Sequence, residues 1–148
     1  MNLQTMGGPL RRALVALAPI AASCCGSSPI TSPRIEQAIE TTFANLVTVQ
    51  VAWLRMRPMD ASEFEVTASC RKQATGSDGG AGDWVCTVRW LGPNGLPLRD
   101  TFDLFVTTDG CYTATATGES LGGPTLTLPD GSDVRNLLHA FEGCFDTT

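Results

Sequence analysis

The sequence has few histidines and few of the spacing motifs that catalytic sites of small hydrolases and metalloenzymes use. It contains one histidine, His139, so any imidazole chemistry depends on that residue. It has no Cys-x-x-Cys pair, which zinc sites and thioredoxin-like redox sites use. The Gly-x-Ser-x-Gly stretch at residues 118–122 lacks the strand-to-helix setting of a nucleophile elbow. We therefore expect no enzyme, no metal and no cofactor; the remaining enzymatic alternative is a hydrolase that uses His139.

Basic residues are also scarce, and Lys72 is the only lysine. Ten basic residues face fifteen acidic ones, for a net charge of −5. Two of the ten, Arg11 and Arg12, and none of the acids lie within residues 1–23, so the rest of the chain carries a net charge of −7. Because nucleic-acid binding needs clustered Lys and Arg, we expect no nucleic-acid partner. The same charge disfavours direct adsorption to anionic lipid.

Long apolar runs are missing as well. The apolar stretch at residues 13–22 is about ten residues long, too short to span a bilayer but typical of the core of a signal peptide. It follows Arg11 and Arg12, and it ends in small residues that are typical of a cleavage region. The sequence thus predicts a signal peptide at residues 1–23 and export of the remainder.

The cleavage region is similar to the lipobox of bacterial lipoproteins. Ala21, Ala22 and Ser23 precede Cys24, although Ala21 stands where leucine is usual. The resemblance implies that Cys24 is acylated, for example with palmitate, and that residues 24–31 tether the domain to the outer face of the cell membrane. The alternative is cleavage after Ala22, which releases a soluble secreted protein.

Residues 32–148 are enough for one domain, and their periodicity predicts an α+β fold. Ser32 and Pro33 open an amphipathic helix whose apolar stripe extends to Leu46. Alternating patterns predict strands, and Ser132 and Gly143 bound an expected closing helix. The expected result is an antiparallel meander of four to five strands between an N-terminal and a C-terminal helix, roughly cystatin-like in its layers. The strands are expected at residues 47–54, 64–70, 84–90, 99–107 and 111–116, with a short edge strand at 126–128.

Four cysteines lie in this domain, and export favours disulfides over metal binding. Cys70 and Cys86 bracket a glycine-rich loop between two expected neighbouring strands, with both side chains on one face. A directly opposed antiparallel pair brings Cβ atoms close enough for a bridge. This predicts the disulfide Cys70–Cys86 and leaves Cys111 to pair with Cys144.

Two groups of residues are candidates for ligand contact. Arg55, Met56, Arg57 and Met59 combine flexible apolar side chains with cations, as contact surfaces do. Four aromatic residues could line a groove, but strand aromatics more often enter the core, and we expect them there. They are Trp53, Trp84, Trp90 and Tyr112.

The region from Ile35 to Ala116 resembles small secreted lipoprotein domains of unknown function from actinobacteria. Cys70, Cys86 and the Trp84-x-Cys86-x-Val88 strand carry the resemblance, whereas Arg71 replaces the usual proline after the first cysteine. The combined expectation is a non-catalytic lipoprotein whose domain binds an envelope protein or a wall component. The alternative is a soluble secreted inhibitor or hydrolase-associated binding module.

Overall fold

The computed structural model describes residues 29–73 and 79–148 as one helix packed on an antiparallel sheet. The predicted signal peptide, Cys24 and most of the predicted tether lie outside these residues. The fold class, the N-terminal helix and the antiparallel sheet agree with the prediction. The elements are α1 (Ser32–Trp53), a 3-10 turn η1 (Ala61–Phe64), β1 (Thr67–Lys72), β2 (Gly82–Leu91), β3 (Pro97–Val106), β4 (Cys111–Ala116), β5 (Thr125–Thr127), β6 (Asp133–Arg135) and β7 (Ala140–Cys144).

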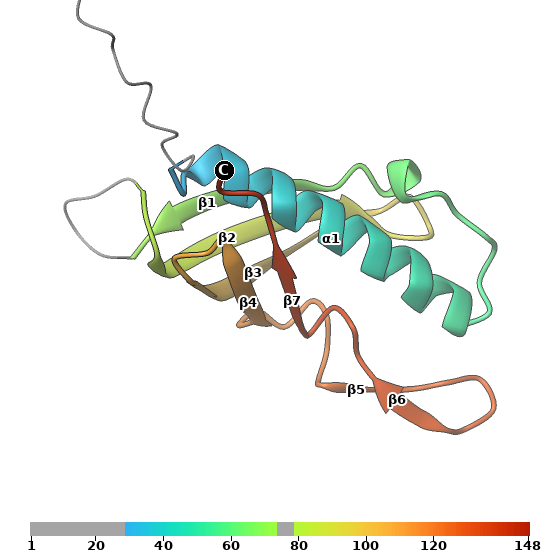
Figure 1. Cartoon of the computed structure of the whole chain (residues 1–148). Coiled ribbons are helices and arrows are strands. Elements are labelled where there is room, and N and C mark those ends of the chain that lie inside the picture. Colours follow the sequence, from blue (N-terminus) through green and yellow to red (C-terminus); the bar gives the residue numbers. More distant parts are fainter. Residues whose placement is uncertain (1–28, 74–78) are drawn as a thin grey trace, which may run out of the picture.

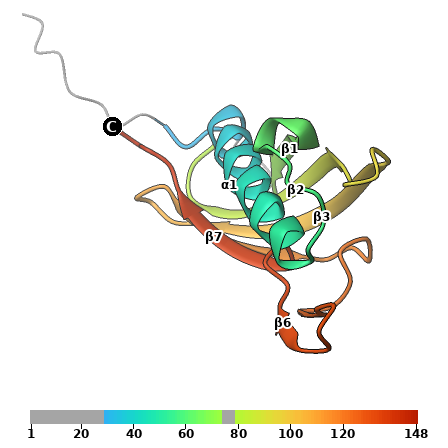
Figure 2. The ribbon, with the colours of Figure 1, turned by 90° about the vertical axis from the view of Figure 1, so that its right-hand side faces the viewer.

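Five strands form the main sheet, in the order β1-β2-β3-β4-β7, and β5 and β6 form a separate hairpin. Figure 1 shows α1 lying across one face of the sheet, with the hairpin projecting below the C-terminal end of the helix. The view in Figure 2, along the helix, shows that the opposite face of the sheet has no second layer among the described residues. The alternation of each strand follows from this arrangement, because only one face is covered.

The core lies between α1 and the inner face of the sheet. Phe43 is at its centre, with its ring centroid 4.9 Å from that of Trp90 and 5.9 Å from that of Phe102. The inner face is apolar along the long strands except at Asp100 on β3, a buried carboxylate that accepts hydrogen bonds from the backbone N–H groups of Thr101 and Leu121. Its apolar residues are Trp84, Cys86, Val88, Trp90, Phe102, Leu104, Val106, Tyr112, Ala114 and Phe141. Burial of this face supplies most of the favourable free energy of folding.

The strand expected at residues 47–54 is wrong, because α1 continues through Trp53. Val47 and Val51 are both buried and lie one turn apart, so the alternating pattern of this segment also satisfies a helical stripe. Packing against the sheet outweighs the β propensity of its valines. The helix also begins one residue earlier than predicted, with Thr31 as N-cap and Pro33 in the first turn.

The expected closing helix is also wrong. Residues 133–135 form β6, and residues 140–144 form β7, which pairs with β4. Leu138 and Phe141 are spaced as on one face of a helix and are both buried, but they reach the core from a turn and from β7. At Gly143 an added Cβ would lie 2.5 Å from Oη of Tyr112, so glycine lets β7 lie close to this ring.

Candidate functional site at the end of α1

The structure pairs the four cysteines of the domain as the sequence predicts. Cys70 lies opposite Cys86 on β1 and β2, and Cys111 lies opposite Cys144 on β4 and β7. The first bridge is buried beneath α1, whereas the second is on the uncovered face of the sheet, with Cys144 exposed. Both bridges fasten an edge strand to its neighbour.

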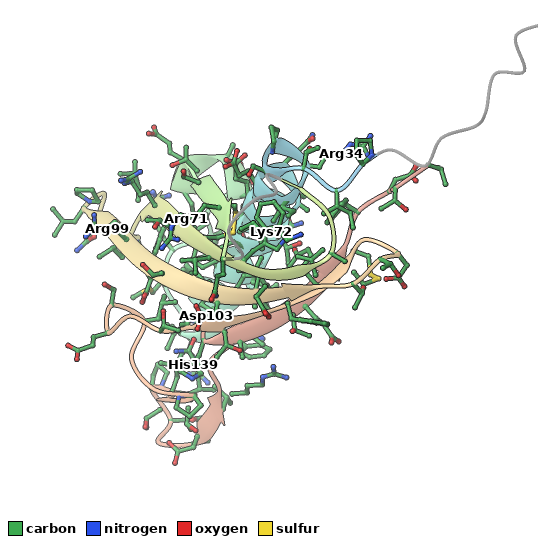
Figure 3. All side chains as sticks on the ribbon, turned by 90° about the vertical axis from the view of Figure 1, so that its left-hand side faces the viewer. Arg34, Arg71, Lys72, Arg99, Asp103 and His139 are labelled. Atoms are coloured by element: carbon green, nitrogen blue, oxygen red, sulfur yellow. A yellow bond between two sulfur atoms is a disulfide. The ribbon has the colours of Figure 1, made fainter. Side chains whose placement is uncertain are left out.

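His139 falls within the expected closing helix, but the structure has no helix there. It lies in the turn between β6 and β7, is half-buried, and its backbone carbonyl accepts a hydrogen bond from Ala116 N. Figure 3 shows it beside the β5–β6 hairpin. Its Nδ1 atom is buried and has no hydrogen-bond partner among the described residues.

Two serines, Ser120 and Ser132, are the nucleophiles that a hydrolase using His139 would need, and each hydroxyl is engaged locally. Ser120 donates its hydroxyl to the carbonyl of Arg99 at 2.7 Å, and the hydroxyl of Ser132 donates to Asp130 at 2.6 Å, so both serines have local partners. Within residues 29–73 and 79–148, no three His, Cys, Asp or Glu side chains are placed to hold a metal ion.

The predicted contact residues follow directly after α1. Arg55, Met56 and Arg57 are exposed, and Met56 keeps 47% of its surface. Arg57 forms an ion pair with Glu63 at 3.0 Å. Met59, in contrast, is half-buried and packs against the core, so it does not belong to the exposed group.

Trp53 differs from the other aromatic residues that the sequence assigns to the core. Trp84, Trp90 and Tyr112 are buried as expected, but Trp53 is 42% exposed because it lies in the last turn of α1. There it lines a cavity of about 320 Å³ together with Arg55 and residues of the β5–β6 hairpin. We call this set the helix-end surface; its members are Trp53, Arg55, Leu128, Asp130 and Val134.

Local hydrogen bonds stabilise the ionised carboxylate of Asp130 on the helix-end surface. The side chain and the backbone N–H of Ser132 both donate to Asp130, which lowers the pKa of this carboxyl group. Asp130 therefore stays ionised in mildly acidic solution. Arg55 adopts a left-handed backbone conformation, with φ of 53°, and ends the helical path. The surface thus combines an exposed indole with a cation, Arg55, and an anion, Asp130, around one cavity.

Sequence analysis missed the contribution of the hairpin. The sequence predicts one short edge strand at residues 126–128, but β5 at Thr125–Thr127 pairs with β6 through a turn at Pro129, Asp130 and Gly131 and forms a hairpin separate from the main sheet. The Pro-Asp-Gly sequence is itself a turn signal, and it was the information that could have located the hairpin.

A second exposed apolar feature lies on the uncovered face of the sheet. Phe105 is 53% exposed and lines a cavity of about 350 Å³ beside the Cys111–Cys144 disulfide. Most of the remaining side chains on this face are polar or charged, and Figure 3 labels three of them, Arg71, Arg99 and Asp103. The face is mixed in charge and has no apolar groove comparable to the inner face.

In the part of the chain that the structure covers, no helix has both the length and the hydropathy of a membrane span. Comparison of the chain with protein-family models, with curated proteins and with solved structures finds no match in any of the three.

Proposed function

We propose that this chain is an exported, non-catalytic binding protein of the cell envelope, and that the helix-end surface contacts its partner. The observation that carries the proposal is the exposure of Trp53 beside Arg55 and Asp130 at a cavity. Exposed tryptophan and arginine are enriched where proteins make energetically important contacts, because each combines a large apolar area with directed polar groups. The partner class is an envelope protein or a wall component.

Export is supported by the two disulfides, which persist outside the reducing cytoplasm. The basic, apolar and small-residue order of residues 11–24 supports a signal peptide, and Cys24 would carry the acyl anchor. The location is then the outer face of the cell membrane. A cystatin-like layering is part of this proposal, supported by one long helix on one face of a meander sheet.

The soluble alternative is a secreted inhibitor or hydrolase-associated module. It requires cleavage after Ala22, and it leaves Cys24 and Cys25 as two thiols at the mature N-terminus. Such thiols are reactive in an oxidising compartment, which favours the anchored form.

Membrane fractionation of cells that express the full chain distinguishes these forms. We expect the wild-type protein in the detergent phase and Cys24→Ser in the aqueous phase or with its signal uncut, whereas Cys25→Ser should behave as wild type. A wild-type mature chain without a diacyl mass would contradict the anchor.

The binding role is tested by cross-linking envelope extracts to Trp53→Ala and to Phe105→Ala. Both residues are exposed, but only Trp53 belongs to the helix-end surface. We expect Trp53→Ala to lose a cross-linked partner that Phe105→Ala retains. Equal cross-linking by both variants would contradict the use of this surface.

A further inference from the structure

The two edge strands of the main sheet, β1 and β7, differ in whether the backbone N–H and C=O groups that point away from the sheet have hydrogen-bond partners. On β1, the hydrogen bond from Gln73 N to Asp83 O fixes the ladder, so Ala68 and Cys70 point their backbone groups away from β2. Side chains of α1 occupy these positions. Glu40 accepts from the Ala68 N–H at 2.8 Å, and Glu36 accepts from the Cys70 N–H at 2.7 Å.

The hydroxyl of Ser32 completes this cover by donating to the carbonyl of Cys70 at 3.0 Å. Ser32, Glu36 and Glu40 are spaced by four residues, so one side of α1 lies along the edge at Ala68 and Cys70. Three of the four outward backbone groups of these two residues therefore have partners on α1, and groups that are already bonded offer little to an incoming chain. We call this the closed edge.

At the β7 edge, in contrast, most of the outward backbone groups have no partner among the described residues. The bonds Phe145 N to Gly110 O at 3.1 Å and Ala116 N to His139 O at 2.8 Å fix its ladder with β4. The alternation then turns the backbone groups of three residues outward, those of Ala140, Glu142 and Cys144.

Only one of these outward groups is covered. Arg135 donates from Nη2 to the carbonyl of Ala140 at 2.8 Å. No residue of the described ranges hydrogen-bonds the backbone N–H or carbonyl of Glu142 or of Cys144. Two consecutive outward positions can thus each donate and accept one main-chain hydrogen bond.

Depressions at both ends of β7 provide room for side chains. One, of about 370 Å³, lies between Leu46 of α1 and Phe141 and is also lined by Leu137. The other, of about 380 Å³, lies between Ala38 and Thr42 of α1 and Phe145. Figure 2 shows β7 at the margin of the sheet, next to α1. An added strand would place alternate side chains toward the helix and toward the uncovered face.

We propose that β7 binds an extended basic peptide segment of another protein, which adds to the sheet as a sixth strand. The unpaired backbone groups select an extended main chain, as in other cases of strand addition. The exposed Glu142 carboxylate lies at the middle outward position, and with the net charge of −7 beyond residue 23 it favours a lysine or arginine opposite it on the uncovered face. The cation is expected at this middle position because Arg135 and Arg34 line the depressions at the two ends of β7.

A second copy of this chain is a poorer occupant of the same edge. The two-fold register that uses all three outward residues of both copies sets the two Glu142 side chains directly opposite each other. Like charges at directly opposed positions are destabilising. The cavity at Trp53 shares no lining residue with either depression, so the two proposals stand or fall separately.

The test uses a seven-residue fluorescent peptide in which lysine and valine alternate, with the mature chain at low salt. Binding is followed by anisotropy, and amide hydrogen exchange of the wild-type protein locates the site. We expect the peptide to slow exchange of the Glu142 and Cys144 amides about tenfold and to leave those of Ala68 and Cys70 unchanged. A peptide that alternates glutamate and valine should bind more weakly.

Variants separate the main-chain contribution from charge. Glu142→Gln should weaken binding several-fold, because it removes only the carboxylate. Glu142→Pro should weaken it at least about tenfold, because it also removes the outward N–H while sparing the bonds to β4. Ala68→Pro removes an outward N–H at the closed edge and should leave binding unchanged.

The proposal is overturned if millimolar peptide protects neither Glu142 nor Cys144, or if protection falls on β1. It is also overturned if Glu142→Pro, with exchange at Phe141 and Gly143 still slow, binds as tightly as wild type. Protection that rises with protein concentration without peptide would assign the edge to a second copy instead.

Discussion

Oε1 of Gln50 accepts a hydrogen bond of 3.0 Å from the backbone N–H of Leu137, across 87 positions of sequence. Gln50 is buried in the helix–sheet interface, so this bond fastens α1 directly to the segment between β6 and β7. Asn136, also buried, donates to the carbonyls of Leu121 and Gly123 and so holds the segment that leads into β5. The position of the hairpin beside Trp53 depends on these two amide side chains.

Gln50→Leu should destabilise the fold by about 1–3 kcal/mol, because it leaves the Leu137 N–H without its partner in a part-buried site. Denaturant unfolding measures the difference. Gln37→Leu is the matched control, since Gln37 is exposed on the same helix, and it should change stability by less than about 0.5 kcal/mol. Equal effects of the two substitutions would contradict a structural role for the Gln50 amide.

Glu36→Ala should destabilise the protein by about 1–3 kcal/mol and increase its aggregation, because it exposes the Cys70 N–H at the edge of the sheet. Glu36→Gln keeps an acceptor oxygen and should recover much of the loss. Thermal unfolding and light scattering of the two variants provide the measurement. A Gln variant as unstable as the Ala variant would show that the charge matters rather than the acceptor.

Mild reduction should open Cys111–Cys144 before Cys70–Cys86. Cys144 is exposed on the uncovered face, whereas Cys70 and Cys86 are buried beneath α1, and thiol–disulfide exchange requires access to sulfur. Alkylation during a dithiothreitol titration, followed by peptide mass analysis, gives the order. Labelling of Cys70 and Cys86 at the lower concentration would contradict the burial that we describe.

Titration of Tyr112, the single tyrosine, at alkaline pH tests whether its ring is buried in the core. Burial raises the pKa of Tyr112 above its ordinary value of 10.0, and the hydrogen bond with Thr42 opposes this in part. A raised folded-state pKa means that the folded protein holds the proton more tightly than the unfolded chain does. The resulting stability is present below pH 10 and is lost as pH rises through the folded pKa.

Absorbance at the phenolate band should therefore show Tyr112 titrating above pH 10 in the native protein and near pH 10 in denaturant. Tyr112→Phe should flatten the fall in stability above pH 10. Native titration at or below pH 10 would contradict the enclosed position of the ring between β4 and α1.

The sequence alone predicts the strands of the main sheet wherever only one face of a strand is buried. Inward and outward residues alternate from Trp84 to Trp90 on β2 and from Asp100 to Val106 on β3, so the pattern predicts both strands and places Cys86 on the inner face. It failed at residues 47–54, because Val47 and Val51 satisfy a strand pattern and a helical stripe equally. Only the sheet beneath them selects the helix.

The prediction of a closing helix in the C-terminal segment was wrong for a related reason. Leu138 and Phe141 are three residues apart, as on a helix, but β4 needed a neighbour and Cys111 needed Cys144 opposite it. The outward residue Trp53 was missed because its exposure depends on where the sheet ends, which no local pattern encodes. Glu36 and Glu40 lie off the apolar stripe of α1, where a helix pattern alone predicts contact with solvent, whereas the edge of β1 provides them with backbone partners.

The Cys111–Cys144 bond also closes a covalent ring around everything between β4 and β7. The β5–β6 hairpin lies inside this ring and supplies Leu128, Asp130 and Val134 to the helix-end surface. A protease that cuts the turn at Asp130 would leave both fragments in one molecule, whose mass rises only by the added water. Such a cut would relax the cavity beside Trp53 while the sheet stayed assembled, so cleavage at this turn would remove the partner contact that we propose for the helix-end surface without releasing the domain.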